Sequence, residues 1–182
     1  MTFINKTITK SKSPYSAREI ALFLLSLDPD RKYFFNRKLN GFFATKISNL
    51  TMGNFRLNAH LQIAQMLYYA HYQQPLFADS IKAYEHGGYV EEVYRDFPLL
   101  LQEKKTKFNL DKKTKEFLTN LFHYLKTNYT NRDLEYFVCE DIAWGKAWER
   151  KTKNTFTYDA EVMDDYRVLI NPLWKDMVGI NY

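Results

Sequence analysis

The chain has 182 residues, a length that suits one domain or one domain with a short arm. Hydrophobic residues make up 46% and aromatic residues 17%, which excludes an intrinsically disordered chain, because disorder needs few aromatic residues. The net charge of +5 is uneven: residues 1–56 hold ten basic and three acidic side chains, a local charge of +7. Such a basic third suits either a solvated surface or an acidic partner, including nucleic acid.

No apolar run approaches the ~20 residues that a transmembrane helix requires, so no membrane partner is expected. The first twelve residues carry positive charge but no apolar stretch, unlike a secretory signal. Cys139 is the single cysteine and has no partner for an internal disulfide. Together these features predict a cytoplasmic protein.

At the start of the chain, residues 1–14 are polar and aperiodic, which predicts a flexible N-terminal arm. The first helix is expected at Ser16, whose side chain can cap it while Glu19 reaches back to the cap. Pro29 disfavours helical backbone in the residue before it, so this helix is expected to stop there.

Residues 31–54 are basic and aromatic. The Asn40-Gly41 pair, between aromatic and β-branched residues, favours a β-hairpin. A helix over 29–39 that ends just before the glycine fits the same residues, and both alternatives stay open.

Helical spacing of apolar residues and capping signals predict the remaining helices. They cover 57–73, 80–85 (ended by Gly87-Gly88) and 90–97 (ended by Pro98), start at Asp111 and at Thr130, and cover 159–170. The helix from Thr130 is expected to run through Ile142. These elements predict a mainly α fold: a compact single-domain helical bundle over residues 15–178 with a small β-hairpin insertion.

The spacing of metal-binding residue types gives no indication of a metal or cofactor. His71, His86, His123 and Cys139 are scattered, without the His-x-x-x-His or Cys-x-x-Cys spacing of common zinc sites. The sequence also lacks a Gly-x-Ser-x-Gly nucleophile elbow and a phosphate-binding loop. No cofactor is therefore expected, and no enzymatic activity is predicted.

A hydrolase that uses His86 with Glu85 or Glu91 is the weakest candidate function, because no nucleophile accompanies the histidine in sequence. A structural role for His86 at a helix end, bonding carbonyls or a carboxylate, is the preferred interpretation. Cys139 lies beside Val138 on a predicted helix, where a cysteine is commonly a small core residue.

Tyrosines crowd the stretch between Gln65 and Tyr94. A tyrosine buries its ring while its hydroxyl seeks a partner, and tyrosine is enriched in protein interfaces. The face of Leu67 and Tyr68 is expected to be internal. The residues predicted to bind a partner are Tyr69, Tyr72, Tyr84, His86 and Tyr89, with Arg31, Lys32, Arg37 and Lys38 facing an acidic rim of that partner.

Residues 57–97 resemble the signature of the SocA-like Panacea domain, also described as phage-associated GepA-like proteins. The matching positions are Leu67-Tyr68-Tyr69-Ala70, Pro75-Leu76-Phe77, and Ile81, Ala83, Gly87, Val90, Val93 and Tyr94. Residues 15–25 and 143–149 are similar to the opening and closing blocks of the family. The departures are Tyr84 in place of a tryptophan, Gly88 and Ala143 in place of prolines, and Val138-Cys139 in place of Thr-His. Relative to shorter members of the family, residues 31–54 resemble an insertion.

The resemblance implies a bacterial or phage-encoded antitoxin of a type II toxin–antitoxin system, without enzymatic activity. Members of the family neutralise unrelated toxins by direct protein–protein contact, and some act as adaptors for toxin proteolysis. A nucleic-acid-binding regulator is the alternative, since the basic third carries interleaved Phe and Tyr side chains that could stack on bases. The two functions are compatible, because many antitoxins also bind the DNA of their own operator.

Overall fold

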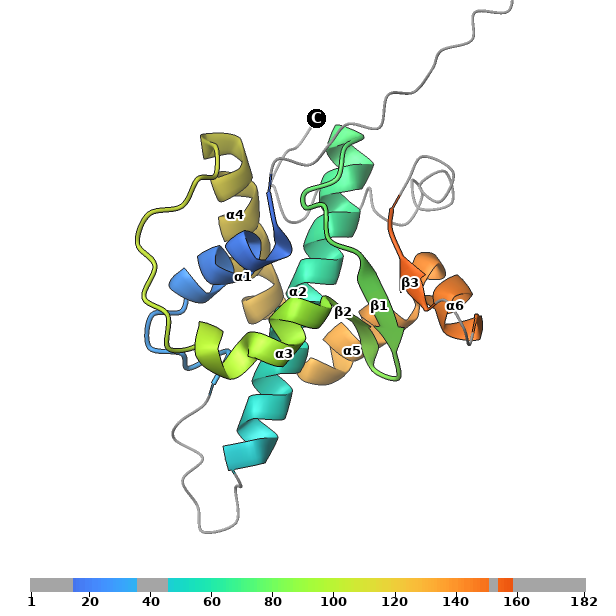
Figure 1. The fold of residues 1–182 in the computed structure, drawn as a ribbon, viewed down its shortest axis with the longest axis horizontal. Helices are drawn as coiled ribbons and strands as arrows, with labels where there is room; N and C mark the ends of the chain where they lie inside the picture. Colours follow the sequence, from blue (N-terminus) through green and yellow to red (C-terminus); the bar gives the residue numbers. More distant parts are fainter. Residues whose placement is uncertain (1–14, 36–45, 151–153, 159–182) are drawn as a thin grey trace, which may run out of the picture.

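The computed structural model describes residues 15–35, 46–150 and 154–158, and for 46–50 only the backbone. Within these residues it contains α1 (Ala17–Ser26), α2 (Lys46–Tyr72), β1 (Ile81–Tyr84), β2 (Gly87–Tyr89), α3 (Glu91–Leu100), α4 (Lys112–Asn128), α5 (Asn131–Cys139), α6 (Ile142–Glu149) and β3 (Thr155–Phe156) (Figure 1). The predicted arm, the Asn40-Gly41 hairpin and the predicted helix at 159–170 lie outside the described residues. The described chain is mainly helical, as predicted, and adds a small antiparallel sheet.

Helix α2 passes through the centre of the fold, with α1, α3, α4 and α5 packed around it (Figure 1). It begins at Lys46, eleven residues before the predicted start, so residues 46–54 of the expected insertion are helical. Residues 46–56 are rich in weak helix formers, with Asn, Ser and Thr residues beside Gly53, so the sequence pattern did not indicate this start. Residues 29–35 form turns rather than the alternative helix.

Gly53 allows α2 to pass close to the turn that follows α1. A Cβ added at this residue would lie 1.7 Å from the backbone oxygen of Phe34, a distance that no side chain can occupy. Phe34 itself is fully buried, and its ring lies 5.8 Å from that of Phe122 on α4. The glycine therefore lets an aromatic turn dock against the middle of the fold.

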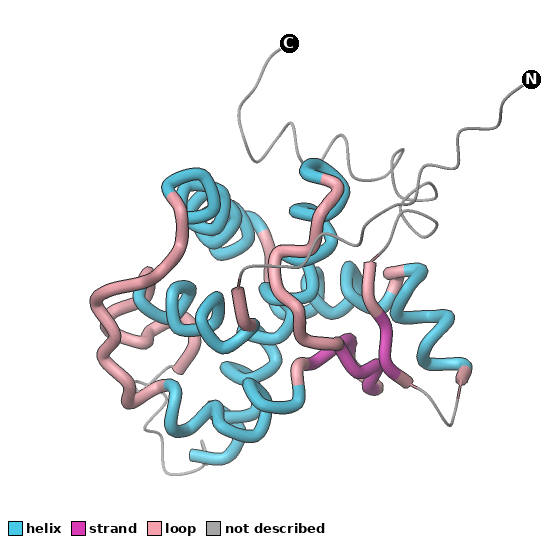
Figure 2. The backbone as a smooth tube through the Cα atoms, turned by 45° about the horizontal axis from the view of Figure 1, so that its top comes forward, coloured by secondary structure: helices cyan, strands magenta, loops and turns pink. Residues whose placement is uncertain are grey.

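Residues 81–89 form a β-hairpin, where the sequence predicted a helix over 80–85. β1 pairs with β2 and with β3, both antiparallel, in the order β2-β1-β3. Burial alternates along β1, with Ile81 and Ala83 inside and Tyr84 half exposed, as the two-residue period of a strand requires. Gly87 follows the turn with φ of 117°, a value that favours glycine. The sheet lies between α2, which contacts β2, and α6, which contacts β1 and β3 (Figure 2).

Local capping signals were predicted correctly. Ser16 accepts a hydrogen bond from the Glu19 backbone N–H, and Asp111 from that of Thr114. Thr130 and Asp133 form both halves of a capping box. At α1 only the serine half forms, because the Glu19 carboxylate instead binds the Lys105 ammonium and the Asn109 backbone N–H.

Pro98 does not end α3, which continues to Leu100. A proline inside a helix leaves the carbonyl four residues earlier without its usual N–H partner. Here that carbonyl belongs to Tyr94, and the side-chain amide of Asn54 on α2 donates to it at 2.8 Å. The contact with α2 thus compensates for the bond that the proline removes.

The helix predicted from Thr130 through Ile142 is two helices. α5 ends at Cys139, and Asp141 then caps α6 by accepting from the backbone N–H groups of Ala143 and Trp144 at 2.8 and 3.3 Å. An aspartate favours the cap position over a helix interior because its short side chain competes for backbone hydrogen bonds. Asp141 therefore starts a new helix in a new direction.

Candidate functional site

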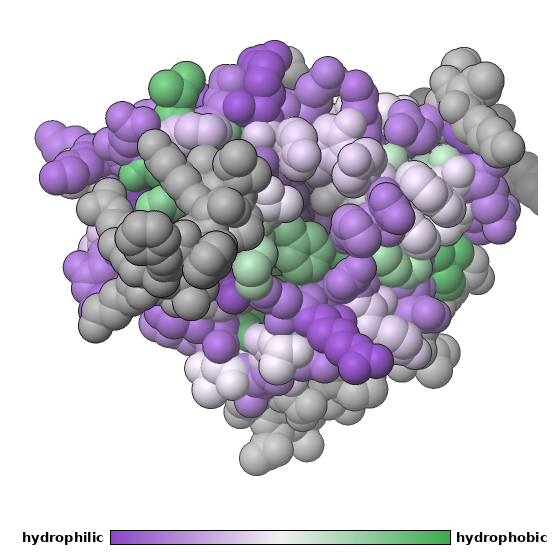
Figure 3. Space-filling model, turned by 90° about the horizontal axis from the view of Figure 1, so that it is seen from below, coloured by the Kyte–Doolittle hydropathy of each residue, from purple (hydrophilic) through white to green (hydrophobic). Residues whose placement is uncertain are grey.

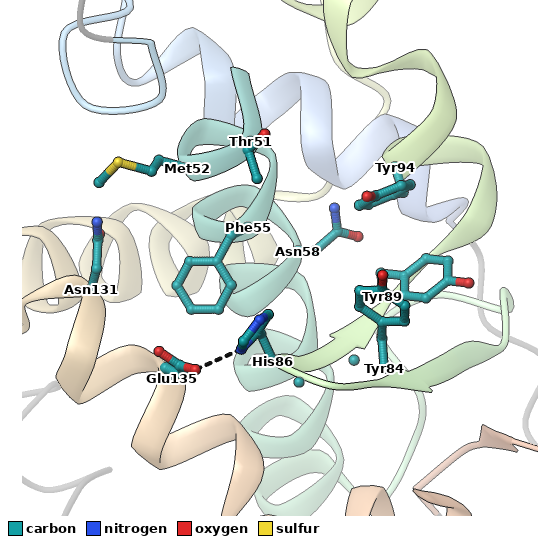
Figure 4. A pocket seen from close by; sticks show the side chains of 12 residues that line it. Thr51, Met52, Phe55, Asn58, Tyr84, His86, Tyr89, Tyr94, Asn131 and Glu135 are labelled. Carbon is teal, nitrogen blue, oxygen red and sulfur yellow. Dashed lines mark hydrogen bonds and ion pairs between the residues drawn. The ribbon is translucent and has the colours of Figure 1, made fainter. Parts of the chain in front are cut away.

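A groove lined by tyrosines lies where α2, the β1–β2 hairpin, α3 and α5 meet (Figure 4). We call it the tyrosine groove and define it by Phe55, Tyr84, His86, Tyr89, Tyr94 and Glu135. The three tyrosines stand on one side, Phe55 stands across from them, and His86 meets Glu135 between the hairpin and α5 (Figure 4). The cavity volume is about 280 Å³.

The tyrosines of the groove pack on one another as a chain of rings. The Tyr84 and Tyr89 ring centroids are 5.7 Å apart and perpendicular, and those of Tyr89 and Tyr94 are 4.9 Å apart. Tyr84 is 50% and Tyr94 45% exposed, and Met52 at the rim is 42% exposed. Among the described residues, none of the three phenol hydroxyls has a hydrogen-bond partner. The rings are held in place while their hydroxyls remain available.

A row of amide side chains on α2 holds the tyrosine side of the groove. Asn54 binds the Tyr94 carbonyl and also accepts from the Asn58 amide at 2.8 Å. Asn58 accepts from the backbone N–H of Val90 at 2.9 Å, and Gln62 from that of Gly88 at 2.6 Å. Because these four-residue steps follow one face of the helix, α2 fixes both β2 and the start of α3.

The same row of amides also bonds the segment between α5 and α6 and the loop before β1. The Gln62 amide donates to the Asp141 carboxylate at 2.8 Å and to the Val138 carbonyl at 3.1 Å. Gln65 accepts from the backbone N–H groups of Leu76 and Phe77. We call Asn54, Asn58, Gln62 and Gln65 the amide ladder. Asn58, Gln62 and Gln65 are buried, and the loss of a hydrogen bond is costly at such positions because water does not replace it.

The charged pair of the groove joins His86 Nδ1 and Glu135 Oε1 at 2.7 Å. His86 sits in the hairpin turn rather than at a helix end, but its predicted bond to a carboxylate is present. The partner is neither Glu85 nor Glu91, and Glu91 instead pairs with Lys82 at 2.6 Å. The hydrolase hypothesis paired His86 with Glu85 or Glu91, and the structure pairs it with Glu135 instead.

The structure divides the predicted tyrosine patch into two places. Tyr84, His86 and Tyr89 meet in the tyrosine groove, where Tyr94 joins them. Tyr69 and Tyr72 lie near the far end of α2, and fourteen residues of helix from Asn58 to Tyr72 span about 21 Å. The Tyr72 ring there packs under the Lys113 ammonium, 3.5 Å from the ring centroid. The predicted set is thus not one surface.

Of the four cations predicted to face an acidic partner, the structure describes Arg31 and Lys32, and neither lines the tyrosine groove. Arg31 turns inward, where its guanidinium donates to the carbonyls of Asp28, Leu101 and others, and burial lowers its pKa. Lys32 is exposed and pairs with Asp30 at 3.0 Å, outside the groove. Arg37 and Lys38 lie outside the described residues. The positions of Arg31 and Lys32 in the sequence did not indicate where their side chains point.

The two other described arginines of the basic third are also engaged. Arg18 pairs with Glu103 at 2.6 Å and with Glu92 at 3.6 Å. Arg56 donates to the Asn131 side chain at 2.6 Å and lies over the Tyr33 ring. The charge of +7 therefore does not translate into a free cationic face within the described part of this region.

Cys139 is partly buried, with its thiol 3.9 Å from the Glu85 carbonyl. Burial, aided by the charges of Glu135 and Glu140, raises the pKa of this thiol to about 11. The thiol is therefore protonated near neutral pH, in a form that is a poor nucleophile.

His60 was not singled out by the sequence, although it is the most enclosed histidine. Its ring is fully buried among Tyr33, Phe34 and Phe122, and burial lowers its pKa to about 4. Nδ1 donates to the Arg56 carbonyl at 2.8 Å. No local sequence pattern distinguishes such a histidine, since its burial depends on turns and helices remote in the chain.

Within the described residues, no three or more His, Cys, Asp or Glu side chains are placed to hold a metal ion. None of the helices in this part of the chain is both long and apolar enough to cross a bilayer. No protein-family model matches the chain, and neither the curated proteins nor the solved structures include a significant match.

Proposed function

We propose that the protein is an antitoxin-like member of the SocA-like Panacea group, which binds a cognate toxin protein and neutralises it by direct contact without a chemical step. The observation that carries this proposal is the tyrosine groove, with half-exposed rings fixed by buried contacts. The sequence resemblance over residues 57–97 supports the same function.

The tyrosine groove has the properties of a protein-docking site. Tyr84 and Tyr94 present large rings that lose little conformational freedom on binding, since neighbouring rings already restrain them. Their hydroxyls are able to bond a partner's backbone. From below the view of Figure 1, the surface is mainly hydrophilic with hydrophobic side chains exposed near its centre (Figure 3). Apolar anchors within a polar rim are typical of interfaces.

The block that carries the family resemblance contributes to both the core and the groove. Leu67, Phe77 and Val93 are buried. Gly87 and Tyr94 from the same block line the groove. The substitution of Tyr84 for the family tryptophan keeps an aromatic ring on the groove wall. A shared core with a variable aromatic surface suits a domain that binds unrelated toxins.

The proposal is tested by co-expression with the product of the adjacent gene in a bacterial host. We expect that product to arrest growth alone and the present chain to restore growth. Replacing both Tyr84 and Tyr94 with alanine should abolish rescue, because truncating central aromatic anchors removes most of the binding energy of an interface. A harmless neighbour, or rescue unchanged in the double variant, would contradict the proposal.

Tyr136→Ala is the matched control for that experiment. Tyr136 is 69% exposed on α5 and lines a separate hollow with Tyr129 and Arg132. It has the same side chain as the groove tyrosines but does not line the groove. Rescue by Tyr136→Ala should equal rescue by the unaltered chain.

The alternative, a nucleic-acid-binding regulator, receives less support. The cationic side chains described in the basic third are engaged with carboxylates, carbonyls or rings, whereas phosphate binding requires available Lys or Arg groups. A mobility-shift titration at low salt tests this function, since the phosphate contribution is strongest there.

A further inference from the structure

The electrostatic character of the tyrosine groove is acidic rather than basic. Glu135 contributes a carboxylate, and the residues that line the groove include neither lysine nor arginine. The nearby cations are paired with carboxylates: Lys82, which also interacts with the Tyr89 phenol, with Glu91 at 2.6 Å, and Arg95 with Asp96 at 2.8 Å. An anionic group entering the groove would therefore meet like charge, whereas a cation would not.

Polar atoms that face the groove are mainly acceptors or groups able to accept. Glu135 uses Oε1 to bind His86, and among the described residues Oε2 has no hydrogen-bond partner. The hydroxyls of Tyr84, Tyr89 and Tyr94 also have no hydrogen-bond partner in the described part of the chain. The side chain that matches this set carries several donors and no acceptor, which describes a guanidinium or an ammonium group.

The aromatic walls favour a guanidinium over an ammonium. Arginine is planar, stacks on tyrosine faces and is more weakly hydrated than lysine, so its transfer into an aromatic groove costs less. It can also donate to a carboxylate oxygen while it stacks. The cavity of about 280 Å³ lies just below the roughly 300–1,000 Å³ of small-molecule sites, and so suits one large side chain.

We propose that the tyrosine groove accepts an arginine side chain from a basic segment of the protein partner. The guanidinium would lie against the tyrosine rings and donate to Oε2 of Glu135, while the flanking apolar residues of that segment contact Phe55 and Met52. This inference rests on the proposed function, because it specifies which chemistry the neutralised toxin presents to the groove.

The experiment uses N-acetyl-arginine methylamide as the probe, and the corresponding leucine and glutamate compounds serve as an apolar and an anionic comparison. Each is titrated into the isotope-labelled full chain, and the backbone amide signals of Gly87 and Gly88 report on the groove. We expect saturable shifts with the arginine compound at a dissociation constant on the order of 1 mM, and binding at least tenfold weaker for the other two. Equal binding of the leucine or glutamate compound would overturn the proposal.

Glu135→Gln and Glu140→Gln form a matched pair of variants. Both remove one negative charge from the same end of the fold, but only Glu135 lines the groove, while Glu140 is exposed beyond α5. Glu135→Gln should weaken the arginine compound about tenfold, as expected for a hydrogen bond to a charged group, and Glu140→Gln should leave it unchanged. Equal affinity of the two variants would refute the role of the carboxylate.

Toxin rescue separates this inference from the proposed function. If the Tyr84 and Tyr94 double variant loses rescue and Glu135→Gln retains it fully, the arginine inference is wrong and the toxin-binding function stands. If the tyrosine double variant and Glu135→Gln both lose rescue while Glu140→Gln keeps it, the proposed function and the arginine inference are both supported. Rescue retained in the tyrosine variant refutes the proposed function, whatever the arginine compound does.

Discussion

Gln62→Leu is expected to destabilise the protein strongly, because it removes the central rung of the amide ladder. Gln62 is 1% exposed and bonds the Gly88 N–H, the Val138 carbonyl and the Asp141 carboxylate. A buried N–H left without an acceptor costs about 1–3 kcal/mol, and a lost bond to a charged group about 1.5–3 kcal/mol. The expected loss is therefore about 3–5 kcal/mol, a large fraction of the stability of a typical domain.

The assay is urea unfolding followed by circular dichroism, with Gln102→Leu as the matched control. Gln102 is exposed, and its side-chain amide donates to the Pro98 carbonyl at 3.0 Å, so its replacement should change the free energy of unfolding by less than about 0.5 kcal/mol. Hydrogen exchange at the Gly88 amide should also accelerate selectively in Gln62→Leu. If the two variants unfold within about 1 kcal/mol of each other, the ladder does not stabilise the fold as argued.

Three further predictions concern positions outside the groove. Gly53→Ala should destabilise the protein by at least about 1–3 kcal/mol, because its Cβ would meet the Phe34 carbonyl, whereas Gly145→Ala, with open space at its Cβ, should stabilise it by up to about 1 kcal/mol in thermal unfolding. Because His60 has a pKa of about 4 in the fold and about 6.5 when unfolded, stability should fall by about 3 kcal/mol as the pH drops across that range. Urea titrations at each pH should show a smaller decrease in the free energy of unfolding for His60→Gln and an unchanged decrease for His123→Gln. Cys139 should react with iodoacetamide at pH 8 more than about 100-fold slower than free cysteine, and a comparable rate would refute its raised pKa.

Caps and core faces were predictable from sequence because they depend on neighbouring residues. Ser16, Asp111 and Thr130 each cap a helix as expected, and Tyr68 is buried with the face that it shares with Leu67. These features need only the local spacing of a polar cap and an apolar stripe.

The hairpin and the groove were not predictable for physical reasons. β1 has four residues, too few for its alternation to be distinguished from a short helix. His86 meets Glu135, 49 positions later, and Tyr94 meets Asn54, 40 positions earlier. Arg31 looked available because a sequence shows charge but not direction. Contacts of this kind arise from packing and become visible only when the helices are placed.

The amide ladder also has a consequence for self-association. An edge strand with bare main-chain groups recruits foreign strands and nucleates fibrils. Along β2, the outward N–H of Gly88 and the N–H of Val90 just beyond it are occupied by glutamine and asparagine side chains from α2. An added strand would therefore find these two N–H donors already bonded, which disfavours strand addition along this margin of the sheet.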